Sequence, residues 1–160
     1  MSKTLTYIKQ AIISEIEGYE FYRMAANGTR DVKMKETYLE LAEEERKHVV
    51  WLQDLHKSID SDSAFDLMAI EAPPSPEIFK WDKLDREEPK TVLSIFGIAL
   101  QLEKASFEFY KKASEEVEES SAKELFKILE VWEKAHFDIF NKEYDLLQKD
   151  WWSKQGFAPF

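Results

Sequence analysis

The sequence predicts an all-α domain in which four helices pack into a bundle. Three observations support this fold class. Glycine and proline number only 4 and 5 among 160 residues, whereas all-β folds need many turns. Apolar residues recur every three or four positions along four segments of the chain, which is the spacing of one helical face. The two halves of the chain also repeat each other, so the helices fall into two hairpins.

The first predicted hairpin covers about residues 4–58. Its first helix runs over about 4–26, and Gly28 is expected to end it in the left-handed conformation that glycine adopts readily. Its second helix runs over about 31–56, where the side chain of Asp31 is suited to cap the free amide groups of the first turn. The short turn between them predicts antiparallel neighbours.

A long linker is expected over residues 59–89. It holds four of the five prolines together with clusters of Ser and Asp, a composition that favours turns, with one helical turn expected near Phe65–Ile70. A connection of this length is uncommon inside a compact domain. It is long enough to run the whole length of a bundle and to set the third helix parallel to the second. We therefore interpret it as a crossover.

The second predicted hairpin covers about residues 90–149, and Pro89 is suited to the first position of its first helix. Ser121 and Glu124 have the spacing of a capping box, which predicts that the fourth helix opens at Ser121. An aromatic tail over 150–160 follows, and we expect it to form a hydrophobic clasp or a dimer contact. The whole chain is then a single domain.

An internal repeat relates the two hairpins, whose equivalent residues are separated by a constant number of positions. Glu15–Ala25 reads EIEGYEFYRMA, and Glu103–Ala113, 88 residues later, reads EKASFEFYKKA. The Glu-x-x-His motif of residues 45–48 recurs at 133–136 with the same offset. A common offset without a gap favours a duplicated hairpin over a chance likeness of amphipathic helices.

Four carboxylates and two imidazoles fall within the apolar stripes of these helices. They belong to Glu15, Glu45, His48, Glu103, Glu133 and His136. Four buried carboxylates would repel one another and lose most of their charge unless something positive lay among them. Two divalent metal ions would cancel the four negative charges. Residues three apart on a helix lie on one face, so each Glu-x-x-His pair could reach a single ion.

These motifs resemble the ferritin-like di-iron carboxylate family, and most closely the erythrin domain of rubrerythrins. The resemblance rests on the Glu-x6-Tyr patterns at 15–22 and 103–110 and on the two Glu-x-x-His pairs. It covers nearly all of the chain outside the linker and the tail. Rubrerythrins carry a further glutamate one turn after the bridging one on the third helix, where this chain has Ser106. They also carry a rubredoxin domain with four cysteines, and this chain has no cysteine.

The resemblance implies roles for individual residues within a ferritin-like four-helix bundle. Glu15 and Glu103 would bridge or clamp two iron ions, while each Glu-x-x-His pair would hold one ion. Tyr22 and Tyr110 would hydrogen-bond ligand carboxylates. Helix geometry alone makes Glu43 and Glu44 poor ligand candidates, because each step along the helix rotates a side chain by about a hundred degrees from Glu45.

The resemblance favours a di-iron oxidoreductase that reduces hydrogen peroxide or O₂ with electrons from an external donor, such as a rubredoxin-like protein. Two alternatives remain open at this point. One is an iron-binding ferroxidase or storage protein, and the other is a non-catalytic bundle stabilised by metal. Manganese or zinc could take the place of iron, because both accept the same ligands. A homodimer is the expected assembly.

Charge and composition exclude several other classes. The net charge of −10 makes binding to nucleic acid or to an anionic membrane surface unfavourable. The lack of cysteine removes disulfides, cysteine-ligated zinc, iron–sulfur centres and thiol nucleophiles, and it fits a reducing cytoplasm. No signal peptide or membrane span is expected, because the N-terminal residues include acids and no long apolar run.

Overall fold

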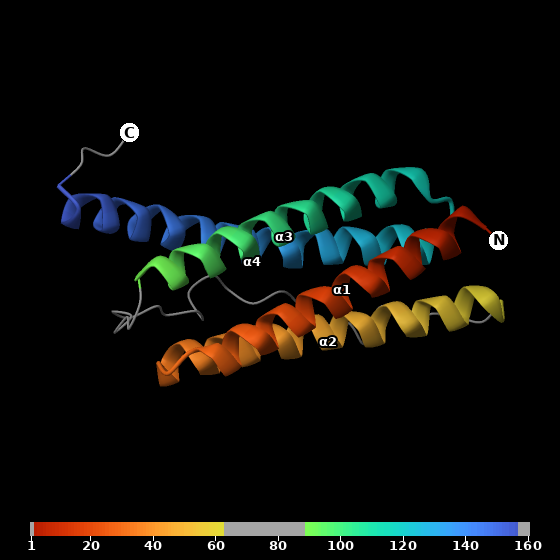
Figure 1. The fold of residues 1–160 in the computed structure, drawn as a ribbon. Coiled ribbons are helices and arrows are strands. Elements are labelled where there is room, and N and C mark those ends of the chain that lie inside the picture. The colour runs from red at the N-terminus through yellow and green to blue at the C-terminus, as the bar shows by residue number, and fades with distance from the viewer. Residues whose placement is uncertain (1, 63–88, 157–160) are drawn as a thin grey trace.

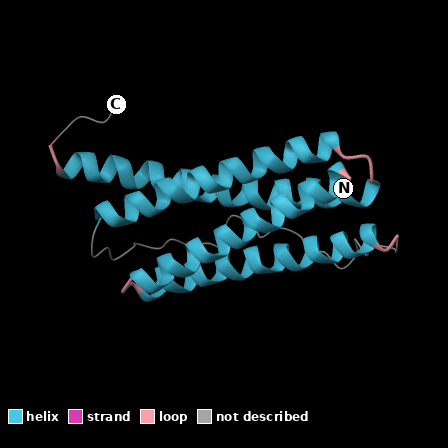
Figure 2. Ribbon diagram, turned by 45° about the vertical axis from the view of Figure 1, so that its right-hand side comes forward, coloured by secondary structure: helices cyan, strands magenta, loops and turns pink. Residues whose placement is uncertain are grey.

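The computed structural model describes residues 2–62 and 89–156, which form four long helices (Figures 1 and 2). The helices are α1 (Lys3–Gly28), α2 (Val32–Asp60), α3 (Pro89–Glu116) and α4 (Ser120–Lys154). Helices α1 and α2 form one hairpin, and α3 and α4 form the other beside it. The predicted four-helix bundle is thus confirmed. No helix within the described ranges has an apolar stretch that could span a membrane.

Contacts near the N-terminus fix the relative direction of the two hairpins. Tyr7 of α1 donates a hydrogen bond to Glu116 at the end of α3, and Thr4 donates one to Glu119 in the turn after it. The start of α1 therefore lies beside the end of α3, and these two helices are antiparallel. Since α1 is also antiparallel to α2, helices α2 and α3 run in the same direction. The linker was predicted over 59–89, but Ile59 and Asp60 still belong to α2. The rest of it up to residue 88, including the helical turn expected near Phe65–Ile70, lies outside the described residues apart from 61 and 62.

Local signals in the sequence located some helix ends correctly. The carboxylate of Asp31 accepts a hydrogen bond from the amide of Met34 at 3.0 Å, which confirms the predicted cap of α2. Helix α3 begins at Pro89, as predicted. Each of these residues meets a local need: Asp31 satisfies an amide that the helix leaves free, and Pro89 lacks an amide where none is required.

Helix α1 ends at Gly28, as predicted, but Gly28 does not have the predicted left-handed conformation; among the described glycines, Gly156 has a positive φ. Both ends of α4 differ from the prediction. Helix α4 opens after Glu119, without a side-chain cap, so Ser121 lies within the helix. The same helix continues to Lys154 and includes Trp151, which the sequence analysis placed in the tail. The aromatic residues there are half-buried on the helix, and packing prolongs it beyond its local signals.

The buried apolar side chains form two clusters along the bundle. One lies around Tyr38 and Phe96, and the other around Leu55 and Phe126. Each cluster draws on all four helices, so each joins the two hairpins. Between them lies a layer of buried polar side chains, and the two clusters hold the backbones of all four helices in place around it.

Candidate metal centre

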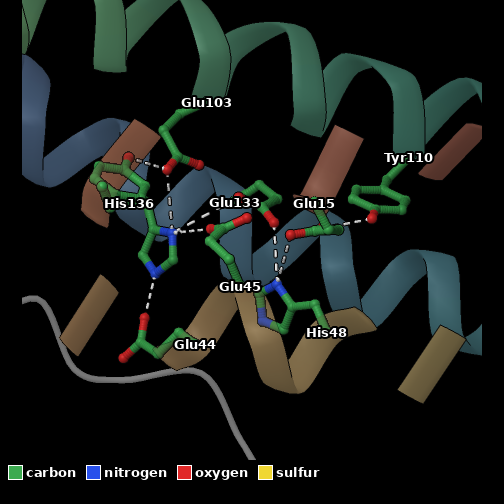
Figure 3. Close-up of polar contacts among 9 residues, drawn as sticks. Glu15, Glu44, Glu45, His48, Glu103, Tyr110, Glu133 and His136 are labelled. Atoms are coloured by element: carbon green, nitrogen blue, oxygen red, sulfur yellow. Dashed lines mark hydrogen bonds and ion pairs between the residues drawn. The ribbon is translucent and has the colours of Figure 1, made fainter. Parts of the chain in front are cut away.

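Six polar side chains meet at the middle of the bundle, and every one is at most 4% exposed (Figure 3). Helices α1 and α3 each supply one glutamate, whereas α2 and α4 each supply a Glu-x-x-His pair. The six are Glu15, Glu45, His48, Glu103, Glu133 and His136. They lie on the core stripes because each follows the apolar residues of its helix at helical spacing. These are the six residues that the sequence analysis selected.

The ligand atoms of these side chains form two groups, each with all atoms within 4.8 Å of one another. Glu15 and His48 belong to one group, and Glu103 and His136 belong to the other. Glu45 and Glu133 belong to both groups. The shared carboxylates therefore come from the Glu-x-x-His motifs. Glu15 and Glu103, which were expected to bridge or clamp two ions, each belong to one group and are the outer glutamates of the centre.

The imidazole of His48 faces the first group. Its Nδ1 lies 3.3 Å from Glu15 Oε2 and 3.2 Å from Glu133 Oε1. Two indoles also pack against this ring, with ring centroids 5.2 Å away at Trp51 and 5.1 Å away at Trp132. His48 thus contacts both carboxylates and indole rings.

The imidazole of His136 faces the second group. Its Nδ1 lies 3.4 Å from Glu103 Oε1, 3.5 Å from Glu45 Oε1 and 3.6 Å from Glu133 Oε2. In both histidines Nδ1 is the nitrogen directed at the carboxylates (Figure 3). A lone pair on Nδ1 could therefore bind an ion in each group.

Two tyrosines bind the outer glutamates crosswise between the hairpins. Tyr22 of α1 donates a hydrogen bond to Glu103 of α3 at 2.5 Å, and Tyr110 of α3 donates one to Glu15 of α1 at 2.6 Å. Both rings are fully buried. Oε2 of Glu15 is thereby left to face Nδ1 of His48, whereas Oε1 of Glu103, which accepts from Tyr22, also lies 3.4 Å from Nδ1 of His136.

The outer glutamates are held ionised by the histidines. Burial acts to raise the pKa of Glu15, but the charge of His48 and several hydrogen bonds lower it to about 2. Glu103 is buried too, and His136 outweighs that burial and lowers its pKa. Burial acts to lower the pKa of each histidine, but Glu15 raises that of His48 and Glu103 raises that of His136. Each outer glutamate and its histidine thus favour the charged state of one another.

The shared glutamates behave in the opposite way. Burial is the largest cause that raises the pKa of Glu45, followed by the charges of Glu133 and Glu15. Burial likewise raises the pKa of Glu133, with Glu15 and Glu103 adding to it. Without a cation, this centre reaches neutrality by binding protons on its carboxylates and imidazoles.

Several buried oxygens are left without a hydrogen bond. Among the described residues, Glu45 Oε1, Glu103 Oε2 and Glu133 Oε2 have no hydrogen-bond partner. A buried polar atom in this state costs about 1–3 kcal/mol. Carboxylates and imidazoles together suit iron, manganese and zinc. The donor set therefore fits two divalent ions, which would satisfy these oxygens and balance four carboxylates.

Glu44 also contacts the centre, although the sequence pattern did not predict this contact. Oε2 of Glu44 lies 2.5 Å from Nε2 of His136, on the side of the ring opposite Nδ1 (Figure 3). Glu44 was expected to be a poor ligand and belongs to neither group of ligand atoms, but it reaches His136 because helix α4 packs against α2. Glu43 is directed outward, where it pairs with Arg46. Periodicity on a single helix cannot reveal such a contact.

Comparisons with known proteins agree with this geometry. A family model described as Rubrerythrin matches residues 6–144. The solved structure of a hypothetical protein from Pyrococcus furiosus is similar, with a TM-score of 0.69 and 27% sequence identity. The likeness covers 91% of this chain and 90% of that chain. Among curated proteins, none matches the chain.

Proposed function

We propose that this chain, which belongs to the rubrerythrin family, is a di-iron carboxylate oxidoreductase that reduces hydrogen peroxide or O₂. One observation supports this proposal above the others. Four carboxylates and two imidazoles form two groups that share Glu45 and Glu133, in the interior of a helical bundle. Such groups are suited to hold a pair of ions close together, with the shared carboxylates between them.

Bound iron would supply the redox chemistry, since it can polarise an O–O bond and give up one electron per ion. Reduction of hydrogen peroxide consumes two electrons and two protons and yields two molecules of water. The chain itself holds the geometry. Tyr22 and Tyr110 orient the outer glutamates, and the apolar clusters on either side exclude bulk water. A buried centre of this kind strengthens the electrostatic interactions within it.

The electrons would come from a separate protein, such as a rubredoxin-like donor, because the chain has no cysteine with which to bind an iron–sulfur site of its own. A homodimer in the cytoplasm is the assembly and location that we propose. Apolar side chains on the outer faces, including Ile13 and Met24 of α1, are available for such a contact.

Metal analysis followed by rapid mixing tests the proposal. The purified protein is analysed for iron, manganese and zinc, then reduced without oxygen and mixed with hydrogen peroxide or with O₂. We expect close to two iron ions per chain and a fast absorption change in the near ultraviolet, faster with peroxide. Bound zinc, or no absorption change with either oxidant, would contradict the redox function.

The same preparation separates the alternatives. A ferroxidase or storage protein would react faster with O₂ and would elute from a sizing column as a large cage. A structural metal bundle would bind metal and gain stability without reacting. Glu43→Ala is the control for variants of the ligands, because Glu43 pairs with Arg46 on the surface.

A further inference from the structure

The two histidines of the metal centre have different surroundings at equivalent positions of the repeat. The residue that precedes the glutamate of each Glu-x-x-His motif is Glu44 in the first hairpin and Trp132 in the second. In the structure each of these residues contacts the histidine of the other hairpin. Glu44 lies against His136, and Trp132 lies against His48. The repeat therefore allows the surroundings of the two histidines to be compared at this position, where a carboxylate in one half corresponds to an indole in the other.

On the His136 side, the outer nitrogen of the ring meets a carboxylate. Nε2 donates to Oε2 of Glu44 at 2.5 Å, while Nδ1 faces the carboxylates of the centre. The side chain of Glu44 is 16% exposed and that of His136 is fully buried. A carboxylate that accepts the outer proton fixes the tautomer, leaving the lone pair on the inner nitrogen, and makes that nitrogen a better donor to a metal.

On the His48 side, two indole rings lie beside the imidazole, where the equivalent position of the repeat holds Trp132 in place of a carboxylate. The centroid of Trp132 is 5.1 Å from that of His48 with the rings nearly perpendicular, and Trp51 lies 5.2 Å away. Among the described residues, Nε2 of His48 has no hydrogen-bond partner. When Nδ1 gives its lone pair to an ion, the proton of the neutral ring sits on Nε2, where it is buried without an acceptor. Binding of an ion by His48 therefore carries the free-energy cost of a buried N–H group without an acceptor, and binding by His136 does not.

We infer that Glu44 is a positioning residue that makes the His136 half of the centre the tighter of two unequal metal sites. The inference rests on the proposed function, in that it takes the six side chains to be metal ligands. It assigns Glu44 no contact with the ion, since Glu44 acts through the imidazole of His136. Partners of this kind contribute about 10–100-fold to metal affinity. The first ion should therefore bind beside His136.

Stepwise titration of the metal-free protein with Co²⁺ tests the inference, because cobalt reports its coordination in the visible spectrum without redox chemistry. In the unmodified protein we expect two binding steps. Glu44→Gln and Glu44→Leu should weaken the first step by about 10–100-fold, with Leu the more severe. Glu43→Gln is the matched control, since its neighbouring carboxylate is on the surface of the same helix turn. It should bind as the unmodified protein does.

Crystals loaded with one cobalt ion per chain give a second readout, because anomalous scattering locates the ion. An ion beside His136 is the expected result. An ion beside His48, or a first binding step unchanged in both Glu44 variants, would overturn the inference while leaving the metal centre intact. Failure of the unmodified protein to bind any metal would overturn the proposed function and this inference together.

Discussion

The hydroxyl of Tyr110 donates a hydrogen bond of 2.6 Å to Oε1 of Glu15, although the two residues are 95 positions apart in the sequence. Tyr22 makes the equivalent bond to Glu103 across the same pair of helices. The helices α1 and α3 are therefore joined by two buried hydrogen bonds at the level of the metal centre. The bond from Tyr110 leaves Oε2 of Glu15 to face His48, whereas Oε1 of Glu103 both accepts from Tyr22 and lies beside Nδ1 of His136.

Replacement of either tyrosine by phenylalanine should destabilise the metal-free protein. The ring remains, but Glu15 in Tyr110→Phe, or Glu103 in Tyr22→Phe, loses a buried donor to a charged carboxylate. We expect the free energy of unfolding to fall by about 1–3 kcal/mol, as measured by urea denaturation. Tyr19→Phe is the control, because the hydroxyl of Tyr19 accepts from Arg23 on the surface. Equal stability of all three variants would contradict a role for these two bonds.

Removal of a shared glutamate should have a larger effect than removal of an outer one. Glu45 belongs to both groups of ligand atoms, whereas Glu15 belongs to one. Glu45→Ala should therefore lose metal from both sites, and Glu15→Ala should retain about one ion per chain. Metal content after dialysis, measured by mass spectrometry on folded protein, distinguishes the two. Full occupancy in Glu45→Ala would remove that residue from the site.

The overall fold could be predicted because the repeat and the helical spacing of apolar residues both identify the side chains that form the core. Apolar residues on one face require burial, and the polar residues embedded in that face are buried with them. All six predicted site residues are indeed buried and adjacent. Their role as metal ligands remains a prediction, since burial and proximity do not establish that an ion binds.

Relations between helices could not be predicted in the same way. The contact of Glu44 with His136, and the sharing of Glu45 and Glu133 between the two groups, depend on how α2 packs against α4. A helical pattern defines a face, but not the rotation of that face against a neighbour. The predicted ends of α4 were wrong for a related reason, since Ser121 lies within the helix and half-buried Trp151 lies on its extension to Lys154.

A glycine provides the space in which one shared glutamate lies. A Cβ atom built on Gly18 of α1 would be 3.0 Å from Oε2 of Glu45 and 3.4 Å from its Cδ. Gly18→Ala should push this carboxylate aside and weaken metal binding at both sites. Gly28→Ala is the matched control, because no atom lies within 4 Å of a Cβ atom there. Comparison of Co²⁺ affinities tests the prediction, and equal affinities in the two variants would contradict it.

Metal uptake should release protons, and metal affinity should rise with pH. Burial and neighbouring carboxylates raise the pKa of Glu45 and Glu133, and glutamates raise the pKa of both histidines despite their burial. In each case the protonated form persists to higher pH than in a free side chain. Because a metal binds the deprotonated form, protons compete with it more strongly as the pH falls.

The metal-free centre should thus release up to about four protons as two ions bind. Calorimetric titration in buffers of different ionisation enthalpy counts these protons. Glu43→Gln should release the same number, and Glu45→Gln should release fewer. Metal binding without proton release would show that the carboxylates and imidazoles are already deprotonated in the metal-free protein.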